Sequence, residues 1–444
     1  MPHSYTYPQK LRKIFRIALP SGANSLLDIV ILALSMFFMG RFGEKYIVAL
    51  SVGMQFMMMF FAINAIFYIG TNAQISRFFG MRDSKEASKV FSTLILLCLL
   101  SAAPIILFAW IGIDMFIAWI GVGTTSANLA HSFLVITIFG IPALLLKNII
   151  VSAFAAIGNT LSIFLVRIFT TLFCIFINYL LIFGVGLNIV GAACANVLTS
   201  YVELFVFIIL IWKKKRFFAQ HFYFRIVWRY FYIALKVGVP SGIERLLTLG
   251  SLVLTTKIVA GFGEFAIAGN EIGSRIEAFA FMPGFGFMVA AMALTGQNLG
   301  ANRVEIAMDL NKTILQVASV IMGIFGVVMA IFARPLSMIF NSAEEVVSIA
   351  SMYLLAVGCS QIPLIWVFVL DGVLRGAGIT KLSLLINACS IWCFRIAPIW
   401  IGITMGLGIW WVFVMIFVET YIRALLFYLA YKNGYWKHSR RALA

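Results

Sequence analysis

The sequence predicts an all-α integral membrane protein with twelve transmembrane helices in two pseudo-symmetric bundles of six. Three observations predict this fold class: the composition, the length of the apolar runs and an internal repeat. Of the 444 residues, 63% are hydrophobic and 11% are charged, and the mean hydropathy is +1.04. Soluble domains carry about 25% charged residues, so this chain has more apolar surface than a water-soluble fold can bury.

The apolar runs are long enough to cross a bilayer as helices. A transmembrane helix needs about 20 apolar residues, and only helices and closed barrels satisfy every backbone hydrogen bond in lipid. Barrel strands would give short alternating patterns of about 10 residues, whereas these runs are continuous. We expect spans at approximately 14–39, 46–72, 88–112, 128–152, 161–184, 189–212, 234–260, 265–292, 312–333, 347–372, 383–404 and 408–431.

The distribution of charge predicts the location and orientation of the chain. A net charge of +17 would favour nucleic acid binding in a soluble protein, but here the basic residues cluster between the spans, where they set membrane topology. Only Arg41, Lys45 and Arg334 fall in loops on the opposite side. We therefore expect a multi-pass protein of the inner (plasma) membrane with both termini cytoplasmic, no cleavable signal peptide and no nucleic acid partner.

The two halves of the chain repeat at a constant offset of 220 residues. The Pro-Ser-Gly at 20–22 returns at 240–242, and the Phe-Gly-Glu at 42–44 returns at 262–264. Each half has six spans, so both halves insert in the same direction, as parallel repeats.

The repeat predicts the domain organisation. We expect an N-terminal lobe over 1–212, an amphipathic cytoplasmic linker over 213–233 and a C-terminal lobe over 234–444. Two such lobes enclosing a cleft are typical of secondary transporters that work by alternating access.

Several motifs resemble those of the multidrug and toxic compound extrusion (MATE) transporters. They are Phe281-Met-Pro-Gly-Phe-Gly, Leu294-Thr-Gly-Gln-Asn-Leu-Gly-Ala301, Leu374-Arg-Gly-Ala-Gly378 with Thr380, and Asn178-Tyr-Leu-Leu-Ile-Phe-Gly184. The resemblance covers essentially the whole chain. It implies a MATE-like fold that exports amphipathic, usually cationic, drugs in exchange for H⁺ or Na⁺. We expect a monomer whose partners are the amphipathic substrate and membrane lipid, with no cofactor besides the coupling ion.

Other classes of function are less favoured by the motifs that the sequence lacks. No GxxxxGK[ST] motif is present, so we do not expect ATP to drive transport, and the absence of HExxH and aspartate-rich isoprenoid motifs argues against a membrane enzyme. One alternative is a flippase for a lipid-linked saccharide of the same superfamily, in which Arg275 and Arg395 would bind pyrophosphate. A non-transporting sensor or scaffold would be expected to carry an appended soluble domain, and we see none.

Acidic residues inside the spans are candidates for ion coupling, because charges in lipid are costly. Asp28 lies near the middle of the first span, two turns before Ser35, where the resemblance places a coupling acid. It either replaces that acid or hydrogen-bonds a neighbour. Glu203 stands alone near the middle of the sixth span. With Glu271 and Glu277 of the eighth span, these residues form our set of ion-coupling candidates.

The eighth span has the densest group of polar residues. Asn270, Ser274 and Glu277 follow at i, i+4 and i+7 and share one face, and Glu271 and Arg275 lie beside them at i and i+4. A glutamate in a half-dry cleft can exchange a proton near neutral pH. Because Arg275 favours the ionised form of Glu271, we rank Glu277 first as proton carrier, and Glu271–Arg275 is alternatively a structural ion pair.

Two further sets of residues complete the expected site. We expect the substrate cavity to include Gln55, Asn178, Asn270, Ser274 and Arg275, and an inner gate of ion pairs to include Glu244, Arg245, Asp371 and Arg375. For Asp371 the alternative is that it extends to the membrane interface. Any bound metal would be Na⁺, with ligands that the sequence does not identify.

Other charged residues in the spans have structural interpretations. Lys147 and Arg167 are expected to reach the cytoplasmic interface, and Glu419 and Arg423 are expected to form an i, i+4 pair. Arg395 lies in the middle of its span and could pair with an acid.

Overall fold

The computed structural model describes residues 5–213 and 216–437, and every element in those ranges is helical. The first half of the chain forms α1 (Tyr7–Gly40), α2 (Glu44–Met81), α3 (Ser84–Ile120), α4 (Thr124–Thr137), α5 (Ile141–Ala156), α6 (Thr160–Tyr179) and α7 (Asn188–Lys213). The second half forms α8 (Trp228–Ala260), α9 (Glu264–Gly300), α10 (Val304–Ile331), α11 (Ala333–Met338), α12 (Glu344–Cys359), α13 (Gln361–Gly376), α14 (Thr380–Cys389), α15 (Ala397–Thr404) and α16 (Ile409–Lys432).

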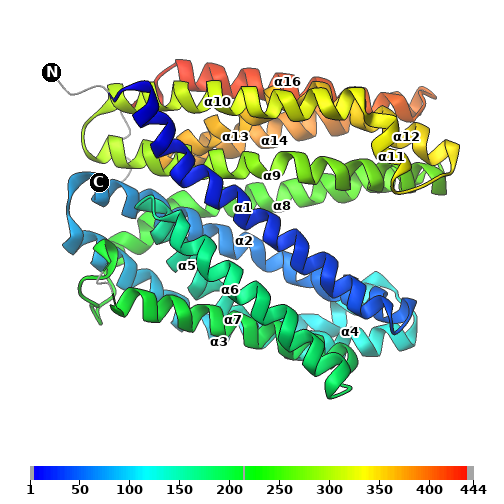
Figure 1. The fold of residues 1–444 in the computed structure, drawn as a ribbon, viewed down its shortest axis with the longest axis horizontal. Helices are drawn as coiled ribbons and strands as arrows, with labels where there is room; N and C mark the ends of the chain where they lie inside the picture. The colour runs from blue at the N-terminus through cyan, green and yellow to red at the C-terminus, as the bar shows by residue number, and fades with distance from the viewer. Residues whose placement is uncertain (1–4, 214–215, 438–444) are drawn as a thin grey trace. The chain divides into compact units, whose positions relative to one another are not determined.

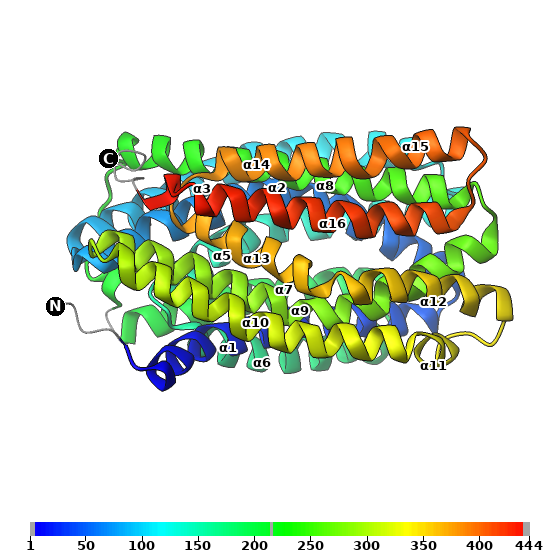
Figure 2. The same cartoon turned by 90° about the horizontal axis from the view of Figure 1, so that it is seen from above.

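Eleven helices of the described chain are long and apolar enough to cross a membrane. The helices α4 and α5 count as one of them, and a π-helical segment at Ser390–Ile396 joins α14 and α15 into another. The pair α12 and α13 makes a twelfth if it is taken as one span bent by 54°, and the bend is visible in Figure 2. The predicted all-helical, twelve-span fold is confirmed on that count.

The chain divides into two compact units whose boundaries fall at the repeated Pro-Ser-Gly motifs. The first unit is Ala23–Gly242, and the second unit is Met1–Gly22 with Ile243–Ala444. The predicted lobes, 1–212 and 234–444, differ from these units at their ends. The start of α1 belongs with the second half of the chain, and the start of α8 belongs with the first.

Close backbone contacts explain these assignments. A Cβ atom on Gly22 would lie 3.2 Å from the Cα atom of Pro283, and one on Gly242 would lie 3.0 Å from the carbonyl oxygen of Ala62. Glycine at the two sites therefore lets α1 approach α9 within the second unit, and lets α8 approach α2 within the first.

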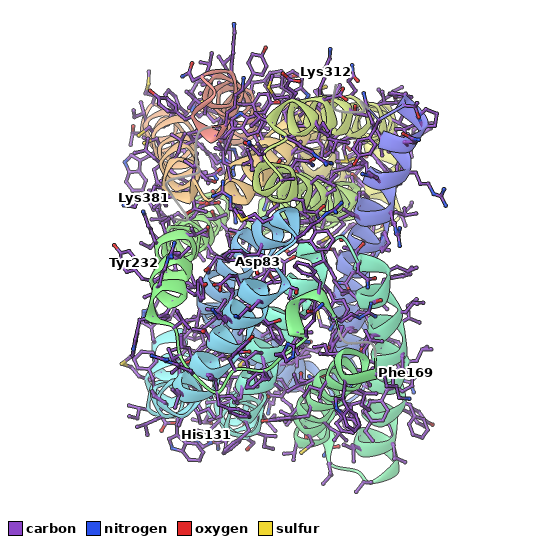
Figure 3. All side chains as sticks on the ribbon, turned by 90° about the vertical axis from the view of Figure 1, so that its left-hand side faces the viewer. Asp83, His131, Phe169, Tyr232, Lys312 and Lys381 are labelled. Atoms are coloured by element: carbon purple, nitrogen blue, oxygen red, sulfur yellow. The ribbon has the colours of Figure 1, made fainter. Side chains whose placement is uncertain are left out.

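Within each unit a central helix organises the packing (Figure 1). In the first unit α2 contacts α3, α4 and α5, and α7 packs on α4, α5 and α6. In the second unit α9 contacts α10, α12 and α13, while α16 packs on α12 and α13. The apolar outer surface is typical of a lipid-facing wall: Phe169 of α6 points away from its neighbours and is 54% exposed (Figure 3).

The connection between the halves is fastened to α3 for most of its length. Only a short 3₁₀ turn, Phe217–Ala219, is helical between Arg216 and Val227. The hydroxyls of Ser88, Ser92 and Thr93 accept hydrogen bonds from the backbone N–H groups of residues 220, 223 and 227, at 3.3, 3.1 and 3.2 Å.

The predicted linker, 213–233, therefore needs two corrections. Its last six residues are the beginning of α8. The segment before them packs inward, because the side chain of Phe218 is fully buried against Phe91 and Phe154, so it does not lie freely along the membrane surface.

We expect Gly286→Val to destabilise the second unit by about 1–3 kcal/mol, as other overpacking substitutions do. A Cβ atom at this position would lie 2.8 Å from the backbone nitrogen of Gly22. Thermal unfolding of the purified protein in detergent measures the effect. Gly123→Val is the matched control, because a Cβ atom there meets nothing within 4 Å; equal losses in both variants would contradict the prediction.

Candidate functional site

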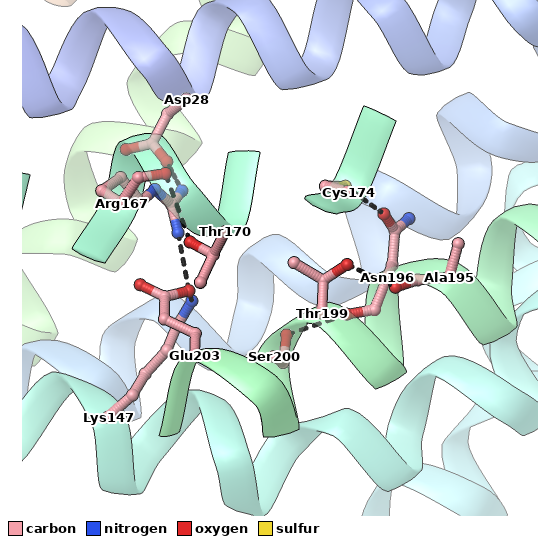
Figure 4. A network of polar contacts seen from close by, with 10 residues as sticks. All are labelled: Asp28, Lys147, Arg167, Thr170, Cys174, Ala195, Asn196, Thr199, Ser200 and Glu203. Carbon is pink, nitrogen blue, oxygen red and sulfur yellow. Dashed lines mark hydrogen bonds and ion pairs between the residues drawn. The ribbon is translucent and has the colours of Figure 1, made fainter. Parts of the chain in front are cut away.

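Four charged residues of the first unit form a connected network (Figure 4). Glu203 of α7 accepts from the ammonium group of Lys147 at 2.7 Å and from the guanidinium group of Arg167 at 2.9 Å. Arg167 also donates to Asp28 of α1. The two carboxylates are thus balanced by two cations, and the network ties together α1, α5, α6 and α7.

Two expectations about this region are wrong. Lys147 and Arg167 do not reach the interface, since their side chains are only 10% and 15% exposed. Glu203 does not stand alone, because both of these cations bind it. A buried carboxylate is costly unless it is paired, and cations on two neighbouring helices supply that pairing here. Asp28 is the exposed end of the network, at 58%.

A stripe of smaller polar residues continues from Arg167 along α6. Asn178 is buried and donates to the carbonyl oxygen of Cys174 at 2.9 Å and to its sulfur at 3.3 Å. On α7, Asn196 faces the same cysteine (Figure 4). The Oδ1 atom of Asn178 is buried without a hydrogen-bond partner among the described residues, so it can accept a bond from water or a ligand.

The second unit has its own network around Arg375, at the end of α13. Its guanidinium group donates to Glu244 of α8 at 2.7 Å and to Asp371 at 2.7 Å. Asn387 of α14 donates to Glu244 at 3.0 Å, and Ser383 donates to Asp371.

The predicted inner-gate set is thus partly assembled. Glu244, Asp371 and Arg375 meet, whereas Arg245 is exposed and is not a member of the ion pairs just described. The alternative in which Asp371 extends to the interface is wrong, because this residue is only 5% exposed.

A third network surrounds Glu419 of α16, which is fully buried. Arg395 contacts its carboxylate at 2.5 Å and Arg423 at 3.1 Å. The expected Glu419–Arg423 pair is present, and Arg395 has found the acid that its position in the span demanded.

Glu277 of α9 has a different environment from these paired acids. Tyr353 of α12 donates to its carboxylate at 2.5 Å, and the structure places no lysine or arginine of the described chain at ion-pair distance from it. The remaining acids buried within the spans, Glu203, Glu244, Asp371 and Glu419, each contact at least one such cation.

The other predicted residues of the eighth span are spread from buried to exposed positions. Glu271 and Arg275 are half-exposed and 3.8 Å apart, a loose pair. Ser274 donates to the backbone of Glu271 at 3.0 Å, and Asn270 is buried. In the first unit, Gln55 is exposed. The predicted cavity residues therefore divide between the two units, with Gln55 and Asn178 in the first.

Sequence reasoning missed Tyr353, Ser383 and Asn387. The repeat could have indicated Asn387, because it lies 220 residues after Arg167 and joins the network of its own unit just as Arg167 does. No local pattern marks Tyr353, which reaches Glu277 from another helix.

Comparison with known proteins identifies what this chain is similar to. The family model described as MatE matches residues 20–180 and 240–401. The chain is 21% identical to a Thermotoga maritima protein named "Probable multidrug resistance protein NorM", over 97% of this chain and 94% of that one. It is 23% identical to an "FAD transporter" of Shewanella oneidensis, over 85% and 86%. The structure of the Vibrio cholerae MATE transporter VcmN in the bent form has 22% identity, covers 98% of both chains and superposes with a TM-score of 0.90.

We expect Arg375→Met to destabilise the protein by about 3–5 kcal/mol, because it leaves two buried carboxylates without a cation. Arg275→Met should cost only about 0–1 kcal/mol, because the Glu271–Arg275 pair is exposed and long. Thermal unfolding in detergent compares the two variants. A similar loss in both would show that the Arg375 network does not stabilise the second unit.

Proposed function

Since the chain belongs to the MatE family, we propose that it is a cation-coupled antiporter which exports amphipathic, cationic drugs or toxic compounds by alternating access of its two lobes. The proposal includes H⁺ rather than Na⁺ as the coupling ion, no other cofactor, a monomeric state, and a plasma membrane location with both termini in the cytoplasm.

The observation that carries this proposal is the isolation of Glu277 from cations. A carboxylate that already binds arginine or lysine has its charge compensated, and removing that charge by protonation breaks an ion pair. Glu277 has a tyrosine hydroxyl as its partner instead. Protonating it therefore sacrifices one hydrogen bond only, and the carboxylate remains available to a proton or to a cationic substrate in turn.

The same geometry supports H⁺ over Na⁺. A single carboxylate is sufficient to carry a proton, whereas a sodium ion needs several oxygen ligands at once. Among the described residues no group of three or more His, Cys, Asp or Glu side chains surrounds Glu277 or any other point.

Asp28 is the second residue that we propose to couple the ion. It is the exposed end of the network in the first unit and has Arg167 as its partner. A proton arriving at Asp28 releases Arg167, which then retains Glu203. The first unit thus responds to protonation by rearranging ion pairs, and the second unit responds through Glu277.

Exchange requires that proton and drug favour different states of the transporter, because a ligand with equal affinity for both states shifts nothing. One pH unit supplies about 1.4 kcal/mol per proton. At one-to-one coupling this drives roughly tenfold accumulation.

The runner-up is transport of an anionic amphipath such as a lipid-linked saccharide. One observation favours it: the guanidinium group of Arg275 is 61% exposed and bound only loosely by Glu271. Arg395, its proposed partner in binding pyrophosphate, is already held by Glu419. We therefore rank this alternative second.

Glu277→Gln should abolish ethidium movement driven by a pH gradient in proteoliposomes. Glu271→Gln is the matched control on the same helix and should retain close to the wild-type rate. Thermal unfolding confirms that both variants fold. Full activity of Glu277→Gln would refute the assignment. Wild-type movement driven by a Na⁺ gradient at fixed pH would name sodium instead, and movement with neither gradient would favour the lipid-linked substrate.

Asp28→Asn should slow the same pH-driven movement, and the double variant with Glu277→Gln should remain folded but show none. Asp28 is exposed, so its loss leaves no buried cation unpaired, because Arg167 keeps Glu203. The same proteoliposome assay measures both variants. Wild-type coupling in the double variant would exclude these two acids as the coupling site.

A further inference from the structure

A groove on the outer face of the second unit lies apart from the proposed transport residues. Helix α13 runs between α10 and α16 (Figure 2). At one end the three helices form a pocket of about 750 Å³, lined by Glu305, Asp309 and Lys312 of α10, Trp366 of α13 and Tyr428 of α16. This end of the groove is charged and aromatic.

The groove continues along α10 as an apolar channel. A second pocket of about 520 Å³ shares Ser319 with the first and is otherwise lined by Val320, Gly323, Ile324, Val327, Val328 and Ile362. Ser319 marks the junction, where its hydroxyl accepts a hydrogen bond from the indole nitrogen of Trp366 at 2.9 Å.

The chemistry of one face of α10 changes in a fixed order along the helix. Residues three or four apart share a face, and the face begins with the carboxylate of Glu305, continues with the ammonium group of Lys312 and then shows Gln316 and Ser319. Only apolar groups follow. Asp309 lies on the same face, but Lys10 of α1 already holds its carboxylate at 2.6 Å.

We propose that this groove binds one phospholipid with an ammonium headgroup. In such a lipid the order from water inward is ammonium, phosphate, ester oxygens and acyl chain. Glu305 would meet the ammonium, Lys312 the phosphate, Gln316 and Ser319 the esters, and the apolar channel one acyl chain. A headgroup with a phosphate and no cation would leave Glu305 facing a neutral or negative group.

The length of the apolar channel agrees with one leaflet of a bilayer. Nine residues separate Ser319 from Val328, about 14 Å along the helix axis. Half of the hydrocarbon core measures about 15 Å. Tryptophan and tyrosine favour the boundary between headgroups and acyl chains, and Trp366 and Tyr428 lie at that level of the groove.

Comparison of the repeats explains why this face suits a lipid and not a segment of chain. The equivalent face of α3 holds the linker through the hydroxyls of Ser88 and Ser92. The residues 220 positions later are Met308 and Lys312. Neither can accept a backbone hydrogen bond, and Lys312 supplies a cation instead.

Native mass spectrometry of the delipidated protein tests the proposal. Phosphatidylethanolamine, phosphatidylglycerol and phosphatidylcholine are added separately, and one tightly retained phosphatidylethanolamine is expected. Gly323→Leu should weaken its retention about tenfold, because a Cβ atom there points at Ile362, 3.4 Å away, and a larger side chain fills the channel. Ala103→Leu, at the equivalent exposed position of α3, is the control and should retain the lipid.

Variants of the headgroup end separate the remaining outcomes. Lys312→Gln and Glu305→Gln should each reduce the preference for phosphatidylethanolamine over phosphatidylglycerol or phosphatidylcholine, and deletion of residues 438–444 should leave binding unchanged. Equal binding of all three lipids by wild-type protein, or undiminished retention by Gly323→Leu, would overturn the proposal. Stronger lipid binding after the deletion would identify the chain's own C-terminal segment as the occupant.

Discussion

Compensation of buried charge is the constraint on which the arrangement of both units depends. Glu203, Glu244, Asp371 and Glu419 lie in helices that are otherwise apolar, and each is held by a cation of the same unit. A bare carboxylate in that environment would cost several kcal/mol. The helices that carry the cations must therefore stay next to the helices that carry the acids, and this fixes α5 and α6 against α7, and α13 against α8.

Against this background Glu277 is the exception, and exceptions to charge compensation in membrane proteins mark places where charge moves. Its hydrogen bond from Tyr353 orients the carboxylate without neutralising it. The contrast gives a simple rule for this molecule: acids with cations hold helices together, and an acid with a hydroxyl partner is free to exchange its proton.

Sequence patterns were sufficient for the fold because length, hydropathy and the repeat are properties of single helices. The resemblance of the motifs around Pro283 and Arg375 to the transporter family is confirmed by the family model. The site was harder, because its pairs join residues far apart in the chain. Lys147 and Glu203 belong to different helices, and no periodicity links them, so the sequence placed Lys147 at the interface. The linker was misjudged for a similar reason: its partners are hydroxyls on α3, which a composition of basic and aromatic residues does not reveal.

The assignment of the first 22 residues to the second unit has a consequence for biosynthesis. The start of α1 leaves the ribosome first, yet the residues that cover it, around Pro283, are made more than half a chain later. Domains generally fold in the order in which they are synthesised, but here the second unit cannot be completed without the oldest segment of the chain. The start of α8 is made after the helices it packs on, so only the N-terminal segment has to wait. A nascent chain arrested before residue 283 would therefore present that segment, still unpacked, to the insertion and quality-control machinery.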